Sequence, residues 1–164
     1  MKTFLPILLL LVAACSGESR RAAVEALRSA GNPPTPPPDT VPEFLDYAAD
    51  LQVDLSDMAK LESGVLYRDI TPGTGPDVVE GDSVLVHYLG WLPNGSLVDS
   101  ALVGVKVGSG DALPGIDAGL IGMKVGGIRK LVLTPGLAYG PDGTSGIPPA
   151  AVLVYDLEVR SKLP

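Results

Sequence analysis

In three segments of the C-terminal half of the chain, large apolar side chains recur at every second position. The segments cover residues 83–88, 130–134 and 153–160. In the last of them, one face carries Leu153, Tyr155, Leu157 and Val159. Successive side chains of a strand point to opposite faces of a sheet, so each segment is predicted to be a strand with one buried face. Pro93-Asn94-Gly95 is a turn signal between strands.

Only one short helix is predicted among these strands. It covers residues 116–123, after Pro114-Gly115, and Gly119 and Gly122 weaken it. Several strands around one short helix predict an α+β domain over residues 64–162 rather than a series of β-α-β units.

Residues 43–63, called the N-terminal arm below, have a different pattern. Phe44, Tyr47, Ala48 and Leu51 follow the i, i+3, i+4, i+7 spacing of one apolar helical face. We therefore expect a helical arm that packs on the following domain. An arm that pairs with a second copy of the chain is the alternative.

The first 14 residues contain one Lys and an apolar run that ends in small residues before Cys15. The run is too short to span about 30 Å of hydrocarbon as a helix, so residues 1–14 are predicted to be a secretory signal peptide. Val12-Ala13-Ala14-Cys15 resembles a bacterial lipobox, whose Cys is acylated and becomes the mature N-terminus. By analogy with lipoprotein sorting, Ser16 favours the outer membrane, facing the periplasm. The alternative is ordinary cleavage that leaves Cys15 as a free thiol.

Residues 15–42 are predicted to be a tether behind this lipid anchor. Six of the ten residues from Pro33 to Pro42 are Pro, which favours an extended polyproline II helix of about 3.1 Å per residue. A spacer that holds the domain off a membrane is the expected role. A docking site for a proline-binding module is the alternative.

Charge and composition exclude several classes of function. The chain has 12 Lys and Arg against 19 Asp and Glu, a net charge of −7, which argues against binding nucleic acid. One Cys and one His cannot build a Cys/His zinc site. The lone histidine, His87, lies on the strand face opposite Val84 and Val86, so a surface or structural role is expected. Without a nucleophile motif, a phosphate-binding loop or a carboxylate pair, the sequence favours a binding pocket that uses no cofactor and no metal.

Seven segments of the C-terminal domain occur in an order that resembles a known family. They are Val86-His87-Tyr88-Leu89-Gly90, Asn94-Gly95 with Val98-Asp99-Ser100, residues 119–127, Arg129-Lys130-Leu131, Ala138-Tyr139-Gly140, Ile147-Pro148-Pro149 and residues 153–158. Together they resemble the FK506-binding-protein (FKBP) family of peptidyl-prolyl cis-trans isomerases. The resemblance covers residues 64–162. It implies a twisted antiparallel β-sheet curled around one short α-helix, with an apolar pocket for proline between them.

An isomerase of this kind needs no catalytic dyad. Rotation about an X-Pro amide has a barrier of about 18–20 kcal/mol but breaks no covalent bond. The twisted amide is less polar than the planar one, so a dry apolar pocket stabilises the transition state more than the ground state.

The resemblance also implies a role for particular residues. The catalytic set would be Tyr88, Asp99 and Tyr139, with Asp99 near the bound carbonyl. The substrate-binding set would be Val98, Val103, Leu113, Ile116, Ile147 and Tyr155, with Leu113 offering its backbone N–H to a carbonyl. Strand alternation independently points Tyr155 inward. Simple core packing is the alternative for each aromatic side chain.

The pocket departs from the family pattern at three points. Val98 and Ile116 stand where larger aromatic residues are usual, and the short segment after Asp99 lacks the basic residue often paired with the family aspartate. We therefore expect a shallow pocket, modest isomerase activity and weak binding of macrolide inhibitors.

Two functions follow as expectations. The first is an exported isomerase that acts on proline-containing unfolded or partly folded polypeptides in the cell envelope. The alternative is a membrane-tethered chaperone or binding module of the same fold with little turnover.

Overall fold

The structure is a computed structural model that describes residues 40–164. The predicted signal peptide, the predicted lipidation site Cys15 and the predicted tether up to residue 39 lie outside the described residues. Within residues 40–164, no helix is long and apolar enough to cross a membrane.

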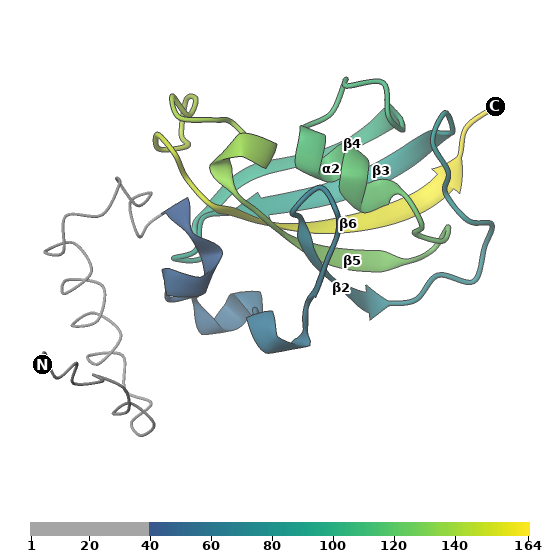
Figure 1. The fold of residues 1–164 in the computed structure, drawn as a ribbon. Helices are drawn as coiled ribbons and strands as arrows, with labels where there is room; N and C mark the ends of the chain where they lie inside the picture. The colour runs from purple at the N-terminus through teal and green to yellow at the C-terminus, as the bar shows by residue number, and fades with distance from the viewer. Residues whose placement is uncertain (1–39) are drawn as a thin grey trace, which may run out of the picture. The chain divides into compact units, whose positions relative to one another are not determined.

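The described part of the chain forms one six-stranded antiparallel sheet with the strand order β1-β2-β5-β6-β3-β4 (Figure 1). The strands are β1 (Ala59–Lys60), β2 (Leu66–Thr71), β3 (Ser83–Trp91), β4 (Leu97–Lys106), β5 (Ile128–Leu133) and β6 (Leu153–Lys162). The three strands predicted from period-two alternation correspond to β3, β5 and β6. An antiparallel sheet with one short helix on its inner face confirms the predicted fold class.

Helix α2 (Pro114–Leu120) is the single α-helix among the described residues, and its bounds differ from the prediction. It begins two residues earlier because Pro114, with its fixed φ, suits the first helical turn. It ends three residues earlier because Ile121 is extended and Gly122 has φ +78°. A left-handed glycine just beyond a helix is a common stop.

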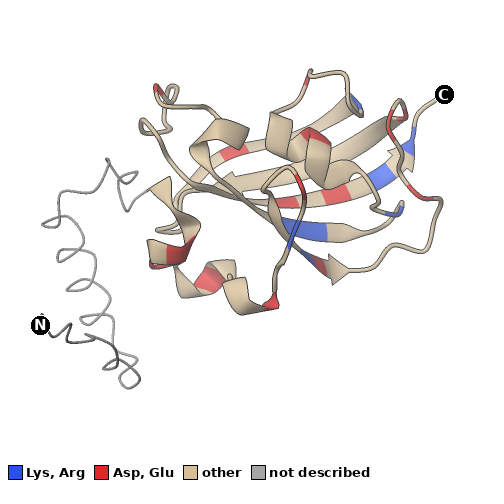
Figure 2. Ribbon diagram, viewed as in Figure 1, with Lys and Arg blue, Asp and Glu red and all other residues tan. Residues whose placement is uncertain are grey.

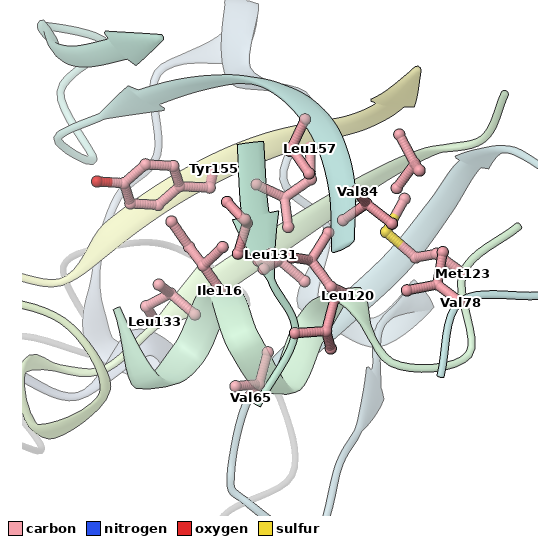
Figure 3. Packing of buried hydrophobic residues seen from close by; sticks show 14 of the residues in the cluster. Val65, Val78, Val84, Ile116, Leu120, Met123, Leu131, Leu133, Tyr155 and Leu157 are labelled. Atoms are coloured by element: carbon pink, nitrogen blue, oxygen red, sulfur yellow. The ribbon is translucent and has the colours of Figure 1, made fainter. Parts of the chain in front are cut away.

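The core lies between α2 and the inner face of the sheet. Its fully buried side chains include Val84, Val86, Leu120, Leu131 and Leu157. Figure 3 shows Tyr155 at one end of this cluster, with its hydroxyl oxygen pointing away from the aliphatic side chains.

The predicted helix in the N-terminal arm does not form. Three 3-10 turns replace it: η2 (Pro42–Phe44), η3 (Ala49–Leu51) and η4 (Leu55–Asp57). Extended residues separate the turns, and Gln52 adopts a left-handed conformation with φ 49° that ends η3. As a result, Phe44 and Leu51 do not share one packed face: Phe44 is 54% exposed, whereas Leu51 is 5% exposed.

The arm nevertheless packs on the outer face of the sheet, opposite α2. Leu51 is buried with Leu66, Val132 and Val154, and Trp91 borders this second cluster. Besides the pairing of β1 with β2, hydrogen bonds at two points join residues 43–58 of the arm to the sheet and its hairpin. They run from the Ala48 N–H to the Pro93 carbonyl at 2.8 Å and from Arg68 Nη2 to the Gln52 carbonyl at 2.9 Å.

Candidate active site

One row of neighbouring residues across three strands brings a carboxylate and a phenol together. Gly90 on β3 pairs with Asp99 on β4 and with Tyr155 on β6. A Cβ atom at Gly90 would lie 2.5 Å from a ring carbon of Tyr155, so the Tyr155 ring occupies the space above the glycine. The glycine therefore leaves a path along which Tyr155 reaches over β3 toward Asp99.

Two phenols converge on one oxygen of Asp99. The hydroxyl of Tyr155 donates a hydrogen bond to Asp99 Oδ2 at 3.0 Å, and the hydroxyl of Tyr139 donates to the same oxygen at 3.1 Å. Tyr88 lies edge-on to Tyr155, with ring centroids 5.8 Å apart and an interplanar angle of 66°. We call Tyr88, Asp99, Tyr139 and Tyr155 the Asp99 cluster.

Burial of the phenols keeps them protonated, so they act as hydrogen-bond donors. Burial is the main cause that raises the pKa of the Tyr155 hydroxyl well above its usual value, and the nearby Tyr139 and the Asp99 charge add to it. Burial, followed by the Asp99 charge, also raises the pKa of Tyr88. The pKa of Tyr139 is raised mainly by burial as well.

Apolar side chains surround the Asp99 cluster. Ile116 in α2 and Ile147 in the loop before β6 are 4% and 5% exposed, Tyr155 is fully buried, and all three belong to the core cluster; we call these three residues the floor. Val98, Leu113, Tyr88 and Tyr139 are half-buried around it. The floor is thus dry, with a half-open rim on which an apolar ring can pack.

The site contains one formal charge and no cation. The chain has no Lys or Arg in residues 69–105, 107–123 or 131–159, which hold every predicted site residue. Figure 2 accordingly shows no basic residue on α2 or on the loop between β5 and β6. None of the ion pairs formed within residues 40–164 includes Asp99.

A residue that the sequence analysis missed, Asp117, organises the loop before α2. Its buried carboxylate accepts hydrogen bonds from the Gly108 N–H at 3.1 Å and the Gly110 N–H at 3.0 Å. Both glycines have positive φ, which glycine adopts without strain. The signal available in the sequence was an acidic residue in the first turn of a short helix, close behind a Gly-Ser-Gly loop.

The loop that Asp117 holds leads to Leu113, the residue before α2. The Leu113 carbonyl accepts the Ile116 N–H at 2.9 Å and the Asp117 N–H at 3.0 Å. Its own N–H donates to no acceptor within residues 40–164. This N–H is therefore available to a ligand carbonyl.

Four of the nine predicted pocket residues form the Asp99 cluster, and Val98, Leu113, Ile116 and Ile147 belong to the same apolar core or pack against it, but Val103 is set apart. It pairs with Val86 and so shares the inner face of the sheet, yet β4 is an edge strand and Val103 is 39% exposed outside the core cluster. His87 lies on the outer face beside Glu158, with Nδ1 3.7 Å from Oε2, and takes no part in the Asp99 cluster.

A separate cavity of about 120 Å³ lies near the other end of α2 and contains none of the predicted site residues. Arg129, one of its lining residues, donates to both carboxylate oxygens of Asp69, at 2.6 and 3.2 Å. Its guanidinium also donates to the Gly119 carbonyl at 2.9 Å. Within residues 40–164, no group of three or more His, Cys, Asp or Glu side chains is placed to hold a metal ion.

Comparison with known proteins identifies the family. The model of the FKBP-type peptidyl-prolyl cis-trans isomerases matches residues 75–160. An FK506-binding protein of Neisseria meningitidis serogroup B is 39% identical over 102 residues, which are 58% of this chain and 94% of that protein. FK506-binding protein 3 of Yarrowia lipolytica is 42% identical over 104 residues, 61% of this chain, and this chain spans only 26% of its length.

A solved structure agrees with the sequence comparisons. The crystal structure of AtFKBP13 has a TM-score of 0.61 at 33% identity and covers 65% of this chain and 98% of its own. The family model, these relatives and the shared fold confirm the resemblance drawn from the sequence. The chain belongs to the FKBP-type peptidyl-prolyl cis-trans isomerase family.

Proposed function

We propose that this protein catalyses cis-trans isomerisation of X-Pro bonds in unfolded or partly folded polypeptides, at the Asp99 cluster. The observation that carries the proposal is a lone carboxylate, held by the hydroxyls of Tyr139 and Tyr155, above a floor of buried apolar side chains. A proline ring packs on the floor, next to Ile116 and Ile147. No cofactor or metal is required.

The proposed mechanism is differential binding of a twisted amide. Twisting removes amide resonance and makes the group less polar, so an apolar environment stabilises the twisted transition state more than the planar ground state. Each ~1.4 kcal/mol of such preference accelerates the reaction about tenfold. The Leu113 N–H binds a substrate carbonyl and fixes the chain on one side of the rotating bond. Asp99, Tyr88 and Tyr139 line the other side.

The site favours weak rather than tight binding of macrolide inhibitors. Val98 and Ile116 offer less ring surface than larger aromatic residues in the same places. Aromatic pairs contribute about 0.5–1.5 kcal/mol beyond buried area, and that contribution is missing here. Titration with a macrolide ligand of the family tests this, and nanomolar binding would contradict it.

A second candidate function, a chaperone or binding module with little turnover, draws on the closed floor. Each of the three floor residues, Tyr155, Ile116 and Ile147, is at most 5% exposed, so the site offers a proline ring only a shallow pocket. Exchange NMR with a proline tetrapeptide and the full chain separates the two functions. Faster cis-trans exchange of the peptide supports the isomerase. Peptide line shifts with exchange no faster than that of the peptide alone would support the binding module and contradict the isomerase.

The proposed location is the outer membrane, facing the periplasm, with Cys15 as the lipid anchor and residues 16–42 as the spacer. Support comes from the lipobox-like sequence and the Pro-rich segment that follows it. Under this proposal, Cys15→Ser moves the protein from the membrane fraction to the soluble fraction and abolishes labelling with a fatty acid. Unchanged labelling in Cys15→Ser would contradict it.

A further inference from the structure

We propose that Tyr155 is a positioning residue, whose hydroxyl holds the Asp99 carboxylate in its working orientation in place of a basic side chain. This inference rests on the proposed function, since the orientation of Asp99 matters through the reaction that it serves. The Tyr155 ring keeps its place in the floor, and the hydroxyl gains a separate role as a support behind the carboxylate.

The first step of the argument is the path that the Tyr155 side chain takes. Asp99 and Tyr155 lie on strands separated by β3, so their Cα atoms are about 10 Å apart, twice the spacing of neighbouring strands. The intervening residue in the row is Gly90, and any Cβ there would meet the Tyr155 ring at 2.5 Å. The ring therefore lies flat over the glycine and brings its hydroxyl within 3.0 Å of Asp99 Oδ2.

The second step is burial. Tyr155 has no exposed surface, whereas Tyr139 and Asp99 are half-buried. A polypeptide that docks on the rim contacts Tyr139 and Asp99 but not the Tyr155 hydroxyl. The influence of Tyr155 on a bound chain accordingly passes through the carboxylate.

The third step is charge. A carboxylate in a partly dry site needs hydrogen-bond donors, and here no Lys or Arg is available within the surrounding segments. Two neutral hydroxyls on the same oxygen supply donors without neutralising the charge. Tyr139 is half-buried at the rim, where a docked chain reaches it. Tyr155, which is locked in the core, is the donor that stays.

A double-mutant cycle on the full chain tests this role. Tyr155→Phe keeps the ring over Gly90 and removes only the hydroxyl. We expect kcat/KM for a proline tetrapeptide to fall about fivefold to tenfold in Tyr155→Phe, which corresponds to the net contribution of one hydrogen bond. In an Asp99→Ala background the same change is expected to alter kcat/KM less than twofold. An equal loss in both backgrounds would mean that Tyr155 acts without Asp99 and would overturn the inference.

A matched control separates the hydroxyl from a general effect of tyrosine removal. Tyr67 also borders the core, but it lies on β2, two strands from Tyr155 on the side away from Asp99, and its ring contacts Arg129. Tyr67→Phe is expected to leave kcat/KM unchanged. A loss in Tyr67→Phe as large as that in Tyr155→Phe would contradict a specific role for Tyr155.

A spectroscopic measurement keeps this inference distinguishable from the proposed function. The ¹³C resonance of the Asp99 carboxyl carbon is expected to shift in Tyr155→Phe and to stay in place in Tyr67→Phe. If the wild type does not catalyse isomerisation, the proposed function fails, and the resonance still reports whether Tyr155 holds Asp99. A resonance that does not move in Tyr155→Phe would overturn the inference, whatever the activity.

Discussion

Arg68 Nη2 donates a hydrogen bond of 2.9 Å to the backbone carbonyl of Gln52, the left-handed residue that ends the second 3-10 turn of the N-terminal arm. This bond joins the arm to the outer face of the sheet. We predict that Arg68→Ala lowers the free energy of unfolding by about 1–2 kcal/mol, because the substitution removes the charged donor and the Gln52 carbonyl loses this hydrogen bond. Urea unfolding of the full chain measures the change.

The same guanidinium lies 3.7 Å from Asp57, and this exposed ion pair provides a control. Exposed pairs in water contribute little to stability. Asp57→Asn is therefore expected to leave the unfolding midpoint unchanged. If Asp57→Asn were as destabilising as Arg68→Ala, the ion pair rather than the Gln52 carbonyl would hold the arm.

Helix α2 approaches the sheet through glycine. A Cβ at Gly119 would lie 2.5 Å from Leu131 Cδ1 in the core. Gly119→Ala improves helix propensity by up to about 1 kcal/mol but overpacks the core at a cost of about 1–3 kcal/mol, so we predict a net loss of stability. Thermal unfolding measures it. Gly136→Ala, where a Cβ meets nothing within 4 Å, is the matched control and is expected to be neutral.

We predict that Asp117 links the stability of the loop before α2 to peptide binding. Asp117→Ala removes the acceptor of the Gly108 and Gly110 N–H groups, and we predict a loss of about 1–2 kcal/mol of stability. Because that loop leads to Leu113, peptide affinity measured by NMR titration is expected to fall as well. Asp111→Ala, an exposed acid in the same loop, is expected to change both properties less. Unaltered peptide affinity in a folded Asp117→Ala protein would contradict a role for this loop in binding.

The buried phenols predict a loss of stability in alkali. The pKa values of Tyr88, Tyr139 and Tyr155 are raised above 10.0, chiefly by burial. The folded protein thus binds more phenol protons than the unfolded chain above pH 10, and the free energy of unfolding decreases as the pH rises further. Their contribution is fully present below pH 10.

The variant Tyr155→Phe isolates one of these phenols. We predict that its denaturant midpoint declines less steeply than that of the wild type between pH 9.5 and 11, since one raised phenol pKa is gone. Other titrating groups are common to both proteins. Equal slopes in the two proteins would show that the Tyr155 hydroxyl ionises at its usual pH and is not held in the core.

The strands were predictable from the sequence because alternation survives wherever one face of a sheet is buried. The N-terminal arm was not, since Tyr47 and Ala48 lie in the stretch between two 3-10 turns although their i+3 and i+4 spacing from Phe44 fits a helix. Tertiary contacts select the turns, above all the hydrogen bond from Arg68 to the carbonyl of the left-handed residue Gln52. Local spacing contains no information about such contacts.

The candidate site was predictable in its members but not in its bonding. Alternation and family resemblance select Tyr155 and Asp99, whereas their hydrogen bond depends on the register that places Gly90 between them. For Val103, the sequence predicts a place in the pocket that the structure does not give it. The family resemblance selects it, and its pairing with Val86 puts it on the inner face, but β4 is an edge strand and leaves it exposed.

The most direct test of the account is a protease-coupled isomerisation assay on the full chain, comparing wild type with Asp99→Ala and Tyr139→Phe. The account predicts a kcat/KM well above background for the wild type, and a loss of about tenfold or more in Asp99→Ala, with circular dichroism showing both variants folded. A wild-type rate at background, or a rate that neither substitution changes, would contradict catalysis at the Asp99 cluster.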